Sequence, residues 1–187
     1  MEEPQDLLRK MRTEIRDVIG RTPAEQGEPI IHFIPVEKEE GKHSEAGPRK
    51  EPTATRRLGV FPSSFNPLTV AHVELTRRAR EKFHLDEVVL VLDAQAMDKE
   101  IQGATLEDRL WMLRLFARSC PGHRVAFSSH GRFLDKLRAF SRLCPDVQEF
   151  CFIVGYDTIV RVLDPKYYDD RERALAELFQ GSRFLVA

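Results

Sequence analysis

The sequence predicts an α/β domain in which a doubly wound, parallel sheet of about five strands carries helices on both faces. Two observations predict this class. From about residue 57 onward, short apolar runs alternate with amphipathic segments of helical period. One of those runs, 88–92, is apolar throughout, as expected of a strand that is buried on both faces. Strands separated by helices need crossover connections, which are right-handed and make neighbouring strands parallel.

The elements of this domain follow one another in a regular order. Each expected strand is a short apolar run, and each long helix has an apolar stripe at helical spacing. Thr105 and Asp108 have the spacing of a capping box, with aspartate in place of glutamate, and mark the start of a helix. In chain order we expect strand 58–61, helix 70–83, strand 88–92, helix 105–119, strand 125–127, helix 133–143, strand 150–154, helix 158–163, helix 171–179 and strand 183–187.

Residues 1–55 differ in composition and are interpreted as an extension of the domain at 56–187. Apolar residues recur at helical spacing between Leu7 and Ile19, and Gly20 fits just past the end of that helix. The run 30–34 is a candidate strand. Residues 37–56 are charged and poor in large apolar side chains, which predicts a flexible linker. Two roles for the extension are alternatives. It is either an arm that joins subunits, which would make the protein a homo-oligomer, or a lid.

Composition excludes several classes of protein. The formal net charge is -1 and the pI is near 6.6, so no overall positive field favours nucleic acid or an anionic membrane. No apolar run approaches the roughly 20 residues that a membrane helix needs. The N-terminus is acidic and lacks an apolar signal core, so we expect a cytoplasmic protein. The three cysteines suggest neither a disulfide framework nor a zinc site, and no metal-binding residues are assigned.

The informative segment runs from Phe61 to His72 and reads F-P-S-S-F-N-P-L-T-V-A-H. It begins at the carboxyl end of an expected strand, where ligands bind in sheets of this class. Thr69 is a plausible N-cap and His72 would be the third residue of the helix. The free N–H groups of a first helical turn bind anions, and His72 can add a donor. The segment therefore predicts a phosphate site, although the chain has neither a G-x-x-x-x-G-K-[ST] nor a G-x-G-x-x-G motif.

The same string resembles the signature of the HIGH-type nucleotidylyltransferases, above all the nicotinamide and nicotinate mononucleotide adenylyltransferases. Their signature reads roughly G-S-F-[DN]-P-x-[TH]-x-x-H, with Ser63 standing here where glycine is usual. The resemblance implies a Rossmann-like fold and transfer of AMP from ATP, with its Mg²⁺, to a mononucleotide with release of pyrophosphate. It also implies that His72 and Thr69 are catalytic, and that the nucleotide is bound by Ser63, Ser64, Phe65, Asn66, Lys99, Arg109, Gly155 and Asp157.

Four of these residues match family motifs farther along the chain, and each has a structural alternative. Lys99 matches a lysine that follows a strand, or is a solvated loop lysine. Arg109 matches the arginine of an [HY]-R-x-x-M helix, or pairs with a neighbouring Asp108 or Glu107. Gly155 and Asp157 match an [IV]-x-G-x-D segment beside the nucleotide sugar, or Asp157 is a helix N-cap.

One family element is missing from the sequence. The family carries a late [ST]-[ST]-x-x-R helix that grips the triphosphate of ATP, and this chain ends at Ala187, in the strand that should precede it. Either the sequence is truncated or that half of the ATP site is lost. A catalytically degenerate nucleotide-binding or regulatory protein is therefore the alternative to an enzyme. Another acceptor, such as phosphopantetheine or a cytidylyl acceptor, and a class I tRNA synthetase fragment are the remaining alternatives.

Overall fold

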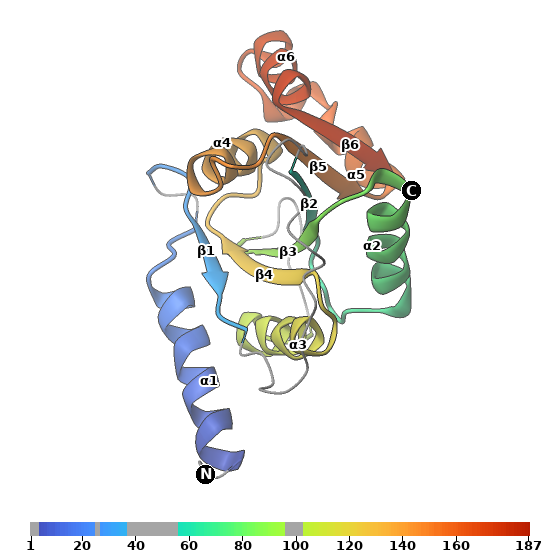
Figure 1. Cartoon of the computed structure of the whole chain (residues 1–187). Coiled ribbons are helices and arrows are strands. Elements are labelled where there is room, and N and C mark those ends of the chain that lie inside the picture. Colours follow the sequence, from blue (N-terminus) through green and yellow to red (C-terminus); the bar gives the residue numbers. More distant parts are fainter. Residues whose placement is uncertain (1–3, 25–26, 37–55, 96–102) are drawn as a thin grey trace.

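The structure, a computed structural model, describes residues 4–24, 27–36, 56–95 and 103–187 (Figure 1). The expected linker 37–56 therefore lies outside the described residues except for Arg56. The strands are β1 (Ile31–Ile34), β2 (Arg57–Pro62), β3 (Glu87–Asp93), β4 (His123–Ser128), β5 (Glu149–Val154) and β6 (Ser182–Val186). The helices are α1 (Pro4–Gly20), α2 (Val70–Phe83), α3 (Leu106–Ser119), α4 (Phe133–Leu143), α5 (Tyr156–Val162) and α6 (Arg171–Gly181), with a 3₁₀ turn at Pro165–Tyr167.

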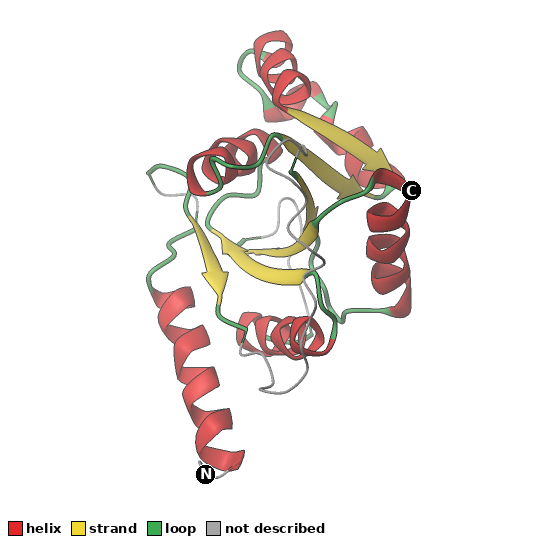
Figure 2. Ribbon diagram, in the orientation of Figure 1, coloured by secondary structure: helices red, strands yellow, loops and turns green. Residues whose placement is uncertain are grey.

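All the strands belong to one sheet with the order β1-β4-β3-β2-β5-β6 (Figure 2). The strands β2 to β6 pair in parallel, which confirms the predicted α/β class with a doubly wound sheet. The expected count of five strands is wrong, because β1 adds a sixth. It pairs antiparallel with β4, with Ile31 opposite Ser128 and Ile34 opposite Val125. The pairing satisfies backbone groups that an edge strand would otherwise leave open.

Helices cover both faces of this sheet. Alternate residues of β3 point to opposite sides, so that Val88 and Leu90 pack into one apolar core and Val89 and Val91 into the other. Apolar residues of α1, α2 and α3 complete the first core, whereas those of α4, α5 and α6 complete the second. The prediction that this strand is buried on both faces is thus confirmed.

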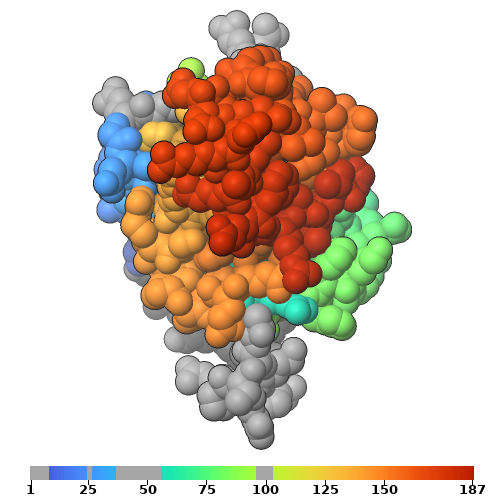
Figure 3. All heavy atoms as spheres, turned by 90° about the horizontal axis from the view of Figure 1, so that it is seen from above, coloured from blue at the N-terminus to red at the C-terminus, as the bar shows by residue number. Residues whose placement is uncertain are grey.

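Most predicted bounds agree with the structure. The helices expected at 70–83 and 133–143 have those bounds as α2 and α4. The helix expected at 158–163 begins earlier, at Tyr156, because Gly155 is its N-cap. Seen from above, the C-terminal segment, coloured orange to red, covers the middle of the molecule (Figure 3).

The N-terminal segment is packed onto the domain rather than separate from it. The guanidinium of Arg114 on α3 is fully buried, lies 2.8 Å from Glu14 Oε2 and donates to the carbonyl of Met11. Arg16 forms a further ion pair with Glu107 at 2.7 Å. The domain boundary near residue 55 stays a prediction. No described helix is long and apolar enough to cross a membrane.

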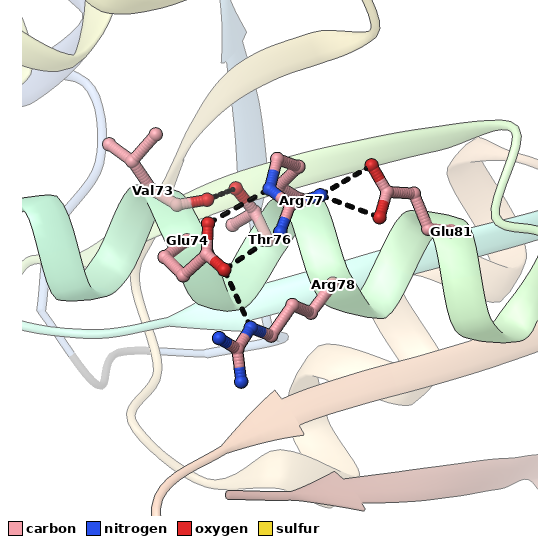
Figure 4. A network of polar contacts seen from close by, with 6 residues as sticks. All are labelled: Val73, Glu74, Thr76, Arg77, Arg78 and Glu81. Atoms are coloured by element: carbon pink, nitrogen blue, oxygen red, sulfur yellow. Dashed lines mark hydrogen bonds and ion pairs between the residues drawn. The ribbon is translucent and has the colours of Figure 1, made fainter.

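The outer face of α2 is a solvated network of charges (Figure 4). Glu74 accepts hydrogen bonds from Arg77 and Arg78, and Arg77 also reaches Glu81. The two arginines lower the pKa of the Glu74 carboxyl to about 2. Because these groups are exposed, salt and water screen their attraction, and the network adds little to stability. The residues of α2 that can serve a site are therefore those of its first turn.

Candidate nucleotide-binding site

The predicted phosphate segment lies at the carboxyl end of β2. This strand sits between β3 and β5, where the direction of winding reverses. Ser63 follows the strand, and its backbone N–H donates to the carbonyl of Val91 on β3 at 3.2 Å. Such a reversal point is where open α/β sheets bind ligands. The loop from Ser63 to Thr69 is thus held at the place where a ligand is expected.

Phe65 anchors the middle of this loop. Its ring is fully buried, packs edge-on against Phe61 at 5.5 Å between centroids, and lies 5.2 Å from the ring of His72. Its backbone has a φ of 41°, which is unfavourable for a residue other than glycine. Burial of the aromatic ring offsets that strain. The ring belongs to the core, so only the backbone of Phe65 is left to contact a ligand.

Asn66 and Arg109 join this loop to the start of α3. The side-chain oxygen of Asn66 accepts a hydrogen bond from the backbone N–H of Ala104 at 3.2 Å. Nη1 of Arg109 donates to the carbonyl of Ser64 at 3.0 Å, and its Nε donates to the carbonyl of Thr105 at 3.4 Å. These contacts fix the loop relative to the N-terminus of α3, which is itself capped by Thr105.

Arg109 is a buried cation that has no carboxylate partner in the described part of the chain. The residue is 5% exposed, and none of the described residues forms an ion pair with it, Asp108 and Glu107 included. Burial lowers the pKa of its guanidinium. A buried charge without a counter-ion is costly. The N–H groups that do not bind Ser64 and Thr105 are available to an anion. The position is therefore better suited to a bound phosphate than to a structural ion pair.

Thr69 and His72 form the N-terminal cap of α2, as predicted. The side chain of Thr69 accepts from the backbone N–H of His72, and the backbone N–H of Thr69 donates to Nδ1 of His72 at 3.0 Å. Because Nδ1 is an acceptor, the proton of a neutral imidazole lies on Nε2. That nitrogen is 3.4 Å from the hydroxyl of Ser63. The cap thus orients His72 so that Nε2–H is the donor beside the loop.

The surroundings of His72 favour its neutral form. Burial lowers its pKa below the ordinary 6.5. The positive end of the α2 dipole also disfavours an imidazolium at this position. A neutral donor can bind a phosphate oxygen without first losing or gaining a proton.

Of the remaining predicted residues, two follow the strand next to β2 and one lies outside the described residues. Gly155 follows β5, the strand next to β2, and is the N-cap of α5. Asp157 is exposed in the first turn of α5, so its alternative assignment as N-cap is wrong. Lys99 lies outside the described residues. Ser63 has no positive φ, so its backbone does not require the glycine that is usual in the family.

Sequence reasoning missed a buried lysine at the same edge of the sheet. The side chain of Lys136 on α4 is fully buried and lies 2.8 Å from Asp93 Oδ1, at the end of β3. Lys136 follows Phe133 by three residues and precedes Phe140 by four, which places it on the apolar stripe of α4. A lysine on the apolar stripe of a helix is the feature of the sequence that could have predicted a buried charge. Among the described residues, no three His, Cys, Asp or Glu side chains gather to hold a metal ion.

Comparison with known proteins identifies relatives of the chain. A sequence profile described as cytidylyltransferase-like matches residues 60–184. A Schizosaccharomyces pombe protein named as a nicotinamide mononucleotide adenylyltransferase is 33% identical over 125 residues, covering 65% of this chain and 47% of that protein. A Citrifermentans bemidjiense protein named as a nicotinate-nucleotide adenylyltransferase is 34% identical over 108 residues, covering 54% and 50%. The chain thus spans about half the length of these curated relatives.

A solved structure is also similar. It is the Plasmodium falciparum nicotinic acid mononucleotide adenylyltransferase complexed with NaAD, with a TM-score of 0.49 and 16% identity, covering 71% of this chain and 75% of that one. The profile match over most of the α/β domain is the finding that decides membership. The chain belongs to the cytidylyltransferase-like family of HIGH-type nucleotidylyltransferases, close to the nicotinate and nicotinamide mononucleotide adenylyltransferases.

Proposed function

We propose that this protein transfers AMP from ATP to nicotinate or nicotinamide mononucleotide in the cytoplasm and releases pyrophosphate. A phosphate oxygen of the mononucleotide attacks the α-phosphorus of ATP, and the bond from that phosphorus to the bridging oxygen of the β-phosphate breaks. The attacking oxygen is already an anion, so the protein needs no nucleophile and no strong base. Catalysis then consists of holding the two phosphates together and neutralising charge.

The observation that carries this proposal is the pair of donors attached to consecutive loop residues. The Nε2 atom of His72 lies at the hydroxyl of Ser63, and the Arg109 guanidinium is bonded to the carbonyl of Ser64. The first is an imidazole whose pKa is lowered by burial, and the second is a buried cation that forms no ion pair with any described residue. Preorganised donors of this kind stabilise charge that develops on a phosphate in the transition state.

The other predicted residues receive supporting roles in the proposal. The hydroxyl and the backbone N–H of Thr69 both contact His72, so Thr69 acts by orienting the imidazole. Gly155 and Asp157 would face the ribose of ATP, and Lys99 would neutralise a substrate phosphate. Mg²⁺ would arrive with the triphosphate and would neutralise part of its charge. Backbone N–H groups of residues 64–66 and of the first turn of α2 would complete the phosphate site, since the N–H of Ser63 is bonded to Val91.

A binding protein without turnover is the second candidate. It is favoured by the hydroxyl of Ser63, which lies beside the Nε2 donor where most family members have glycine. Such a protein would bind ATP at the same loop but would not release pyrophosphate.

The test is an assay of pyrophosphate release with Mg-ATP and each mononucleotide in turn, with ATP binding measured separately by calorimetry. The proposal expects pyrophosphate with at least one acceptor and none when the acceptor is omitted. ATP binding without pyrophosphate from either acceptor would reject the enzyme and favour the binding protein. Neither binding nor turnover would reject both.

A further inference from the structure

Lys136 is a buried cation that joins the ends of two strands. Its side chain is fully buried, and its ammonium lies 2.8 Å from the carboxylate of Asp93. It also donates to the carbonyls of His130 at 2.8 Å and Gly131 at 2.6 Å. These partners satisfy the hydrogen-bonding capacity of an ammonium, which has three N–H groups.

The partners of Lys136 all lie at the carboxyl edge of the sheet. Asp93 is the last residue of β3, whereas His130 and Gly131 follow β4. The same edge holds the loop at Ser63, whose N–H is bonded to β3. Lys136 therefore ties together two strand ends that neighbour the phosphate loop.

The loop after β4 is held by further contacts besides Lys136. The hydroxyl of Ser128 donates to the carbonyl of His130 at 3.0 Å. The hydroxyl of Ser129 accepts from the backbone N–H of Ile30 and lies 2.7 Å from Nδ1 of His130. Both the backbone and the imidazole of His130 are thus fixed. A buried ion pair is a poor means of gaining stability compared with an apolar contact, so its use here suggests a need for defined geometry.

We infer that Lys136 and Asp93 are positioning residues for the half of the site that binds the mononucleotide. The inference rests on the proposed function, in which Gly155 and Asp157 at the end of β5 face the ribose of ATP. The side of His72 toward β3 and β4 is then left for the second substrate. Lys136 acts through the loop that it holds, because its own ammonium is already occupied.

The test compares Lys136→Met with Arg114→Met by steady-state kinetics in which each substrate is varied. Arg114 is the matched control, since it is equally buried but pairs with Glu14 of α1. We expect Lys136→Met to raise the KM for the mononucleotide at least about tenfold, because small displacements of a binding loop have effects of this size. The KM for ATP should stay within about twofold, and Arg114→Met should change neither KM.

Asp93→Asn is the second variant, and it tests the same positioning role if Lys136→Met does not fold. It removes the charge of the carboxylate but keeps its size, so we expect a smaller rise confined to the KM for the mononucleotide. If the role of Lys136 and Asp93 is purely structural, the variants lose stability and both KM values stay unchanged, which overturns the inference. An equal rise in the KM for ATP and the KM for the mononucleotide overturns it as well. If the wild-type protein neither releases pyrophosphate nor binds a mononucleotide, the proposed function fails and this inference fails with it.

Discussion

Arg109 and Arg114 lie on the same helix, five positions apart, and both are buried, at 5% and 0% exposure. Arg114 has a carboxylate partner, Glu14, and a carbonyl partner in α1. Among the described residues Arg109 has only carbonyl partners, one of them in the phosphate loop. Glu14 neutralises the charge of Arg114 within the protein. The charge of Arg109 is left to be neutralised by a bound anion.

The comparison of the two arginines shows which features distinguish a structural cation from a candidate phosphate ligand. Burial alone does not distinguish them, and neither does residue type. The distinguishing feature is that no described carboxylate is paired with Arg109, together with its place at the carboxyl edge of the sheet.

Removal of the imidazole donor at Ser63 should have a larger effect than any other change. His72→Ala should lower kcat by about 10²–10³, as does the loss of one preorganised donor elsewhere. His123→Ala is the control, because His123 is also a half-buried histidine with a lowered pKa but begins β4 at the opposite edge of the sheet. Unchanged kcat in His72→Ala, or an equal loss in both variants, would refute the assignment. Pyrophosphate release well below the unfolding temperature is the measurement.

The second prediction concerns Arg109 and separates its effect on catalysis from its effect on stability. Arg109→Met should lower kcat/KM about a hundredfold, because a charge-neutralising ligand of the phosphate is lost. Its free energy of unfolding should stay level or rise, since the variant no longer buries an unpaired charge. Kinetics and urea unfolding of the same preparation measure the two quantities. A large loss of stability with normal kcat/KM would make Arg109 a structural residue.

Arg114→Met should show the reverse pattern. It leaves Glu14 without its partner, and we expect the free energy of unfolding to fall by about 2 kcal/mol, below the full cost of breaking a buried pair because Glu14 is partly exposed. The turnover of the folded protein should not change. Urea unfolding gives the first quantity and pyrophosphate release the second. A loss of turnover without a loss of stability would contradict this role.

The smallest effect is a dependence of stability on pH. Burial lowers the pKa of His72 and of His123 below 6.5, so near and below that pH the unfolded chain binds more protons than the folded one. The stabilising contribution is therefore complete above the unfolded pKa and declines as the pH falls below it. Urea unfolding at about pH 5 and about pH 7.5 should give the lower free energy at the acidic pH.

His123→Gln should reduce that difference, because glutamine does not titrate but can still bond to the hydroxyl of Thr76. A variant with the same pH dependence as the wild type would show that His123 does not contribute to it.

Much of the fold was predictable because its signals are local. The bounds of α2 and α4 follow from apolar periodicity, and the Thr69–His72 cap follows from the residue types at the start of α2. The strand β1 was recognised, but its place in the sheet was not. It pairs with residues 125–128, and nothing local in a four-residue run specifies a partner so distant in sequence.

The sequence named the residues of the proposed site, whose roles stay predictions, but not the contacts between them. The motif located His72 and Arg109, but the bond from Arg109 to the carbonyl of Ser64 depends on how two loops meet in space. Phe65 matched a binding motif, yet its ring is core, because burial depends on the whole fold. The partners of Lys136 come from the ends of two other strands, so no local pattern contains them.

The most direct test of the central claim is ATP binding by calorimetry to the wild-type protein, Arg109→Met and Arg114→Met. We expect equal Kd values for the wild type and Arg114→Met, and binding at least about tenfold weaker for Arg109→Met, since a charged hydrogen bond to a phosphate would be lost. The same Kd for all three proteins would contradict the claim that the unpaired arginine is a ligand for the nucleotide.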